Sequence, residues 1–221
     1  MKAALSYDLI KKVYNQTAGY YDRYHNLGTY GLDERGRKFL VNKIVKPGDY
    51  ILDAGGGTGN TALKALRKAG RGGKAVVLDF SSGMLKKAMQ NAEKTGFRDA
   101  MEISEGDMYD IPFPDNTFDD VFSTYSTCPL ADPVLAVKEM LRVTKVNGLL
   151  GIAHSTNPSG KIARLLSACI EYFIWKFPAL SLGCRNIHII DDIKRLPVEV
   201  VEDRIIGFIP FYFRLIIFKK L

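Results

Sequence analysis

The chain reads Asp53-Ala54-Gly55-Gly56-Gly57-Thr58-Gly59-Asn60 directly after a short apolar run, residues 50–52, and before a helical pattern over 60–69. Because glycine lacks a Cβ, such a turn between a strand and a helix lets backbone approach a ligand closely. A second apolar run, residues 74–79, follows the helical pattern. A strand, a helix and another strand in this order predict a parallel α/β sheet.

The same alternation continues on both sides of this unit. Asp33 is a plausible N-cap before an apolar periodicity, and Pro133 suits the first turn of a later helix. We expect further helices over residues 5–24, 33–45, 83–95, 133–143 and 160–177. We expect further strands over residues 101–104, 118–123 and 148–154, and two β-rich runs over 198–206 and 209–218.

The glycine spacing indicates which ligand the turn binds. Residues 55–59 read G-x-G-x-G, but position 60 is Asn, and no Gly-Lys-Ser/Thr follows as a phosphate loop requires. A carboxylate at Asp53 would repel a pyrophosphate and attract a cation. Asp79 lies 20 residues after Gly59, the offset at which an acid accepts the hydroxyls of a ribose. An adenosine with a positively charged tail is S-adenosylmethionine.

Four more blocks carry a family resemblance. They are Leu78-Asp79-Phe80-Ser81-Ser82-Gly83-Met84-Leu85, Glu105-Gly106-Asp107-Met108, residues 111–119, and Glu139-Met140-Leu141-Arg142-Val143. With the glycine turn, they make residues 14–155 resemble the class I S-adenosylmethionine-dependent methyltransferases. Within that class, the chain is similar to the ubiquinone/menaquinone biosynthesis C-methyltransferase group, methyltransferase type 11.

The resemblance implies a fold and a set of cofactor contacts. The fold is a Rossmann-like, seven-stranded, mostly parallel sheet flanked by helices, with an N-terminal helical cap and a helical insertion after strand five. We expect one domain over residues 1–221, with a cap over 1–45, a cofactor-binding core over 46–155, and a substrate cover with the last strands over 156–221. The implied cofactor-binding residues are Asp53, Gly55, Gly56, Gly57, Gly59, Asn60, Asp79, Phe80, Met84, Gly106, Asp107, Met108, Ser123 and Tyr21.

Their roles follow from the same resemblance. The glycines wrap the methionine part of the cofactor, Asp53 lies near its ammonium, Asp79 holds the ribose, and Asp107 with the Met108 backbone reads the adenine. The N-terminal segment Ala18-Gly19-Tyr20-Tyr21-Asp22 looks like the family's cap of this pocket, with Tyr14 as a further lid contact. An aromatic residue at helical spacing can equally be a core residue.

Two residues are candidates for catalysis. His154 ends strand five and titrates near neutrality, so it could remove a proton from the acceptor, or it could only satisfy nearby backbone. Tyr125 ends strand four, where it could orient the acceptor or simply pack. The segment Tyr125-Ser126-Thr127-Cys128-Pro129 departs from the family, whose quinone enzymes carry an aromatic residue, glycine, arginine and asparagine there. No His/Cys cluster has metal spacing, so we expect no metal.

Composition and charge limit the location and the partners. The net charge of +7 is spread along the chain without long basic runs, so we expect no nucleic acid partner. Three cysteines without C-x-x-C spacing argue against a disulfide framework and favour a cytoplasmic protein. The N-terminus shows no signal peptide, and no apolar run reaches the roughly 18 to 20 residues of a spanning helix.

The methyl acceptor is expected to be small and apolar. Residues 162–177 and 208–218 are rich in apolar and aromatic side chains and have basic flanks, which favours a lipid-like, isoprenoid quinone-like acceptor and a peripheral membrane contact. The alternatives are N-methylation of an amine, such as a phospholipid headgroup or small metabolite, and a non-catalytic module that only binds S-adenosylmethionine.

Overall fold

A computed structural model describes residues 6–158, 160–175, 184–208 and 211–221. In this part of the chain, the strands form one seven-stranded sheet in the order β3-β2-β1-β4-β5-β7-β6. Only β7 runs antiparallel to its neighbours β5 and β6. The strands are β1 (Tyr50–Ala54), β2 (Lys74–Asp79), β3 (Met101–Glu105), β4 (Phe118–Thr124), β5 (Thr144–Ser155), β6 (Val198–Phe208) and β7 (Phe211–Lys220). The predicted seven-stranded, mostly parallel sheet is confirmed.

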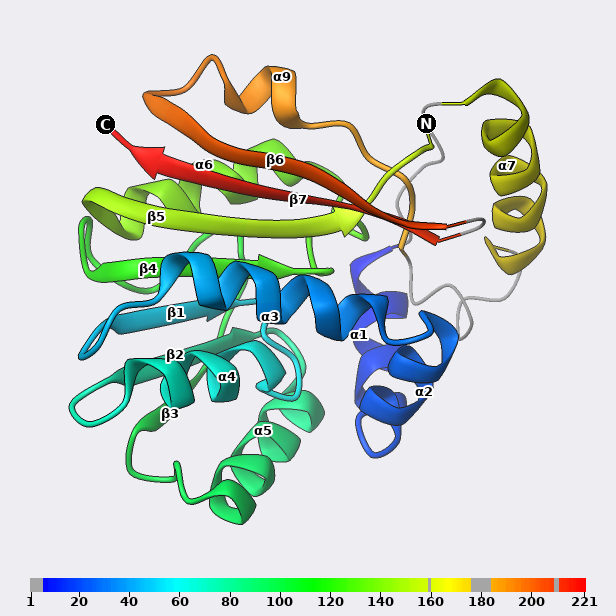
Figure 1. Cartoon of the computed structure of the whole chain (residues 1–221). Helices are drawn as coiled ribbons and strands as arrows, with labels where there is room; N and C mark the ends of the chain where they lie inside the picture. Colours follow the sequence, from blue (N-terminus) through cyan, green and yellow to red (C-terminus); the bar gives the residue numbers. More distant parts are fainter. Residues whose placement is uncertain (1–5, 159, 176–183, 209–210) are drawn as a thin grey trace.

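Helices cover both faces of the sheet (Figure 1). One hydrophobic core joins it to α3 (Leu32–Ile44), α4 (Asn60–Ala69) and α5 (Ser82–Thr95). A second core, on the other face, joins it to α6 (Pro133–Val143) and the short α9 (Ile190–Ile193). Strands buried on both faces must be apolar throughout, which explains the continuous hydrophobic runs of β1 and β2.

Local signals fix the helix starts that border the site. Gly59 adopts a left-handed conformation (φ 79°) and precedes α4, as glycine does at low cost. The Ser81 side chain accepts a hydrogen bond from the Met84 backbone and so caps α5. Both helices therefore begin at the carboxyl edge of the sheet, immediately after β1 and β2.

Several predicted boundaries are wrong. The single helix expected over 5–24 is two helices, α1 (Tyr7–Thr17) and α2 (Tyr21–Gly28), with Tyr20 in a non-helical conformation at the start of the second. Gly19, a poor helix former, lies in the break. Asp33 does not cap α3; a left-handed Gly31 does, and Asp33 is buried inside the helix.

The later elements differ less from the expectation. Strand β5 begins at Thr144 rather than near 148 and includes Asn147 in a left-handed conformation (φ 65°). The helix expected over 160–177 is α7 (Lys161–Trp175), and residues 176 and 177 lie outside the described residues. The last strand begins at Phe211, and residues 209 and 210 also lie outside them. The predicted helical insertion after strand five is confirmed.

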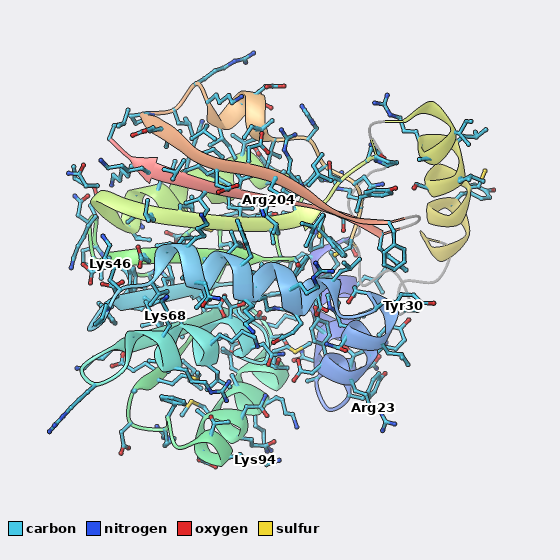
Figure 2. The ribbon with its side chains drawn as sticks, viewed as in Figure 1. Arg23, Tyr30, Lys46, Lys68, Lys94 and Arg204 are labelled. Carbon is cyan, nitrogen blue, oxygen red and sulfur yellow. The ribbon has the colours of Figure 1, made fainter. Side chains whose placement is uncertain are left out.

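The N-terminal helices and α7 lie at one end of the molecule (Figure 1). Helices α1 and α2 lie beyond the carboxyl ends of β1 and β4, and α7 stands further out on the same side (Figure 1). Arg23, Lys46 and Lys94 extend from different edges of the molecule (Figure 2). Tyr30 lies where β6 and β7 meet, in ring contact with Phe208 and Phe211.

Candidate functional site

A cavity opens at the carboxyl edge of the sheet, bounded by the glycine turn, the ends of β2 and β3, the loop after β4, and the N-terminal helices. Its wall combines backbone, one buried acid and many aromatic side chains. The lining residues are Tyr7, Ile10, Tyr14, Tyr21, Gly55, Gly57, Asp79, Phe80, Met84, Gly106, Asp107, Met108, Tyr109, Ser126, Pro129, Leu130 and Ala131. A mostly apolar wall with few polar groups is typical of a small-molecule site.

At three positions of the turn, the backbone conformation or the neighbouring atoms require glycine. Gly55 has φ 66°, and a Cβ there would lie 2.5 Å from the Cβ of Ser126. Gly57 has φ 55°, and a Cβ there would meet only Met84 Sδ at an ordinary contact distance of 4.0 Å, so its constraint is conformational. Between them, a Cβ on Gly56 would lie 2.8 Å from the Asp53 carboxyl carbon. The turn thus exposes backbone to the cavity and covers Asp53 with backbone alone.

Asp79 supplies the buried acid of the cavity wall. Its carboxylate accepts hydrogen bonds of 2.9 Å from the backbone N–H groups of Gly57 and Ser81, which join the glycine turn to the start of α5. Burial raises the pKa of Asp79 to about 6, against the lowering effect of these hydrogen bonds. The group is therefore ionised at neutral pH and able to accept further hydrogen bonds from a ligand.

Asp53 lies beneath the turn rather than in the wall. One carboxylate oxygen accepts a 3.0 Å hydrogen bond from the Ala62 N–H of α4, while Oδ1 is buried without a partner among the described residues. Burial raises the pKa of Asp53 to about 7. A buried carboxylate with only one hydrogen-bonded oxygen lowers the stability of the fold. Packing alone therefore does not explain an acid at position 53.

Polar contacts fasten the first two helices to the starts of α4 and α5. Asp22 of α2 accepts hydrogen bonds from Thr58 Oγ1 (2.5 Å) and Asn60 Nδ2 (2.8 Å), at the end of the glycine turn. Asn15 of α1 accepts from Ser81 Oγ (2.8 Å) and from the Gly83 backbone N–H (3.0 Å), at the start of α5. These contacts hold both helices over the cavity.

Aromatic rings form the outer wall that these helices bring in. The rings of Tyr7 and Tyr14 lie 5.2 and 5.9 Å from that of Phe80, which follows β2. Tyr14 also contacts Tyr21 at 5.9 Å. Burial raises the pKa of Tyr14 and of Tyr21 well above its ordinary value. The two phenols stay neutral and pack as rings on the cavity.

The two predicted catalytic residues lie behind the wall. Tyr125 has φ 63° and is buried, and its hydroxyl donates a 3.1 Å hydrogen bond to the backbone carbonyl of Asp33. Its neighbour Ser126 lines the cavity instead and donates to the Gly55 carbonyl at 2.5 Å. His154 is fully buried; Nδ1 lies 2.9 Å from the Ser155 carbonyl oxygen, and Nε2 has no partner among the described residues. Burial lowers the pKa of His154 to about 4.

A buried ion-pair network supports this side of the site. Asp33 Oδ2 lies 2.6 Å from Arg37 and 2.8 Å from His25 Nδ1, and Oδ1 accepts from Thr29. Although burial opposes it, the hydrogen bond of His25 and the charge of Arg37 hold the pKa of Asp33 well below its usual range. The Arg37 guanidinium also lies 4.9 Å over the Tyr125 ring. The network fixes Tyr125 and thereby the direction of the Ser126 loop.

Sequence reasoning found one side of the cavity better than the other. Of the predicted residues, the structure brings Tyr21, Gly55, Gly57, Asp79, Phe80, Met84, Gly106, Asp107 and Met108 to the wall. Gly56, Gly59, Asn60, Asp53 and Ser123 lie outside this lining, and Ser123 Oγ is buried without a partner among the described residues. The prediction missed Tyr7, Ile10, Tyr109, Ser126, Pro129, Leu130 and Ala131. The one sequence signal that could have indicated such residues is a position just after a strand end, as at Ser126.

The residues present fit S-adenosylmethionine. Gly55 and Gly57 leave room for a ligand against backbone, Asp79 can accept ribose hydroxyls, and Asp107 with Met108 lies further along the same wall. The unpartnered Oδ1 of Asp53 lies under the turn, where a cation would favour the ionised carboxylate. The cavity therefore suits a ligand with a nucleoside at one end and a cation at the other.

Comparison with known proteins gives the same class. The model of the ubiE/COQ5 methyltransferase family matches residues 2–182. The chain is 35% identical over 156 residues to a demethylmenaquinone methyltransferase of Desulfitobacterium hafniense, covering 69% of this chain and 62% of that protein, which is less than two thirds of it. It is 30% identical over 174 residues to a ubiquinone/menaquinone biosynthesis C-methyltransferase UbiE of Hahella chejuensis, covering 78% and 68% of the two chains.

Solved structures agree on the fold. A geranyl diphosphate methyltransferase in complex with GPP and sinefungin matches with a TM-score of 0.69 at 18% identity, over 85% of this chain and 77% of that one. A SAM-dependent methyltransferase from Aquifex aeolicus matches with a TM-score of 0.64 at 19% identity, over 94% and 98%. The predicted class I methyltransferase fold is confirmed. On the extent of the family match, this chain belongs to the ubiE/COQ5 methyltransferase family.

Proposed function

We propose that this protein transfers a methyl group from S-adenosylmethionine to carbon or oxygen of a small, apolar, quinol-like acceptor. The observation that carries the proposal is the cavity itself, which joins the glycine turn and Asp79 to a wall of tyrosines. When bound, the cofactor supplies a methyl group on a positively charged sulfur that is already activated for transfer. The protein's own contribution is then to bind, align and exclude water.

The cofactor half of the cavity is formed by the sheet edge. Asp79 would accept the ribose hydroxyls, and its hydrogen bonds to the backbone of Gly57 and Ser81 hold the carboxylate in place for that role. Asp53 would attract the ammonium through the glycine backbone above it. Gly106, Asp107 and Met108, at the end of β3, would hold the adenine.

The acceptor half is formed by the N-terminal helices and the loop after β4. Tyr14 and Tyr21 stay neutral, so they offer apolar faces and exclude water. Pro129, Leu130 and Ala131 complete an apolar wall opposite them. The printed names of two similar curated relatives concern quinone biosynthesis. These names favour the quinol-like acceptor over an amine.

Proton removal is the least direct part of the proposal. His154 is neutral at physiological pH because burial lowers its pKa to about 4, and its Nε2 has no partner among the described residues. It can accept a proton only through an intervening group, because it does not line the cavity. Tyr125 would act as a positioning residue, since its side chain is held by Asp33 and Arg37.

Helix α7 supports a lipid-like acceptor. Exposed apolar side chains at Ile162, Leu165, Leu166 and Tyr172 recur at helical spacing, and the exposed fractions of Ile162 and Leu165 are 78% and 67%. No helix in the described ranges is long and apolar enough to cross a membrane. We propose that this face rests on a membrane surface, where a lipid-like acceptor is held.

The test is transfer of a labelled methyl group. The purified protein is incubated with S-adenosylmethionine labelled in the methyl group and either a lipid extract or a polar-metabolite extract, and the labelled product is identified by mass spectrometry. A labelled quinone-like lipid is the expected result, and a labelled amine alone would replace it with the N-methylation alternative. Cofactor binding without any labelled product in either extract would favour the non-catalytic binding module.

A further inference from the structure

Two cysteines that are far apart in sequence meet behind the cavity wall. Cys128 Sγ and Cys184 Sγ lie 2.7 Å apart. Cys128 belongs to the loop after β4 and is fully buried, while Cys184 is half-buried and lies in the segment before α9. Both sulfurs also approach the carbonyl oxygen of Tyr125, at 3.3 and 3.6 Å. Their separation of 56 residues gives no C-x-x-C signal.

The two backbones are held together independently of the sulfurs. Arg185 Nε donates to the Cys128 carbonyl oxygen at 3.3 Å, and its Nη2 donates to the carbonyl oxygens of Leu130 and Ala131. Arg185 is buried, so these bonds are sheltered from water. The segment that carries Cys184 is thereby fixed on the loop that carries Cys128, and the two thiols are kept in contact.

The contact makes the two thiols chemically unequal. Burial opposes ionisation of Cys128, but the hydrogen bond from the Cys184 thiol lowers the pKa of Cys128 below its ordinary value. Donating that bond, together with burial, raises the pKa of Cys184. One sulfur is thus suited to attack as a thiolate, and the other is placed to resolve the product.

We propose that Cys128 and Cys184 are an oxidative modification site that forms a reversible disulfide with hydrogen peroxide as the oxidant. The Cys128 thiolate attacks one peroxide oxygen, the O–O bond breaks, and the departing hydroxide takes up a proton to give water and a sulfenic acid. The Cys184 sulfur then attacks the Cys128 sulfur, the S–O bond breaks, and hydroxide leaves with the Cys184 proton as water. Two thiols have lost two electrons and two protons, and hydrogen peroxide has become two waters.

The modification would act on the wall of the candidate site. Residues 129–131, which line the cavity, follow Cys128 directly. A disulfide would join this wall covalently to the segment that carries Cys184, before α9. The chemistry itself does not depend on the methyl acceptor.

The experiment oxidises the whole protein and locates the bond. Reduced protein is treated with hydrogen peroxide at one equivalent, the remaining thiols are alkylated, and intact mass and peptide maps are recorded. We expect a loss of about 2 Da for two hydrogens, a peptide cross-linked between Cys128 and Cys184, and recovery of both thiols with a dithiol reductant. If Cys128 and Cys184 of the peroxide-treated wild type are both still free thiols and become alkylated, the proposal is wrong.

Matched variants separate this pair from the third cysteine. Cys184→Ser, at the half-buried position, should abolish the mass loss and the cross-link. Cys169→Ser, at an exposed position on α7, should retain both. A mass loss that persists in Cys184→Ser, or disappears in Cys169→Ser, would show a different pairing and contradict the proposal. Neither result depends on whether the protein transfers methyl groups.

Discussion

Replacing Asp53 with Asn tests whether the buried carboxylate under the glycine turn lowers the free energy of unfolding. Asp53 is fully buried, and only one of its oxygens has a hydrogen-bond partner among the described residues, the Ala62 N–H. Asn keeps the shape and an oxygen for that partner but carries no charge. We therefore expect Asp53→Asn to stabilise the ligand-free protein at alkaline pH.

The pKa of Asp53 determines the size and the sign of the change in the free energy of unfolding with pH. Burial raises it to about 7, while the unfolded value is about 3.9. Between these values the folded state binds more protons than the unfolded state, so the free energy of unfolding falls as pH rises from about 4 to about 7. Three pKa units at about 1.4 kcal/mol each give a penalty of about 4 kcal/mol at pH 8. A buried amide N–H₂ without an acceptor offsets about 1 to 2 kcal/mol of the gain.

Urea unfolding at pH 5 and pH 8, without cofactor, measures the effect. Asp53→Asn should exceed the wild type in free energy of unfolding by about 2 to 3 kcal/mol at pH 8, and this advantage should shrink by about that amount at pH 5. Asp99→Asn, at an exposed position, is the control and should change little at either pH. An Asp53→Asn protein less stable than the wild type at pH 8, or a difference independent of pH, would refute the reasoning.

Three further changes test the site and its support. Asp79→Asn should weaken S-adenosylmethionine binding about 10- to 150-fold in calorimetry by removing charged hydrogen bonds. The wild-type affinity should also fall below about pH 6, where Asp79 protonates, and this fall should be smaller in Asp79→Asn; an equal fall in the variant would contradict its cause. Gly55→Ala and Gly57→Ala should each lose about 1 kcal/mol of stability for the left-handed backbone, and Gly55→Ala about 1 to 3 kcal/mol more for its clash with Ser126; equal losses in urea unfolding would exclude the clash. Asp33→Asn should lower the free energy of unfolding by about 3 to 5 kcal/mol by leaving buried charge unpaired, and a neutral result would remove the network from the account.

The sheet could be predicted because its evidence is local. A glycine turn between an apolar run and a helical periodicity fixes one parallel unit, and the remaining runs alternate in the same way. The break between α1 and α2 was missed because apolar residues continue across it, while the backbone turns at Tyr20. Asp33 was read as a cap because its type suits caps, although Arg37 and His25 pair with it inside the protein.

The site residues likewise divide into those that local sequence signals predict and those that they do not. Gly55, Gly57 and Asp79 follow strand ends, and strand ends of a parallel sheet meet at one edge, so sequence order alone places them together. Tyr125 also ends a strand, but its left-handed backbone turns its side chain toward Asp33 and presents Ser126 to the cavity. A sequence pattern does not specify such a turn for a non-glycine residue.

Contacts between residues far apart in the chain could not be predicted from the sequence. The approach of Cys128 and Cys184 depends on how residues 184 and 185 pack on the loop after β4 and on the bonds that Arg185 makes there. Similarly, Tyr7 and Ile10 reach the cavity because Asn15 fastens α1 to the start of α5 and Lys11 pairs with Glu105 at the end of β3. These contacts connect residues whose local patterns contain no information about each other.

Calorimetric titration of the wild-type protein with S-adenosylmethionine, and with its demethylated product, tests the central claim most directly. Asp99→Asn, which removes an exposed carboxylate outside the cavity lining, is the matched control for Asp79→Asn. The account predicts that the wild type and Asp99→Asn bind both compounds, and that Asp79→Asn binds them much more weakly. Absence of binding to the wild type, or equal binding by all three proteins, would contradict it.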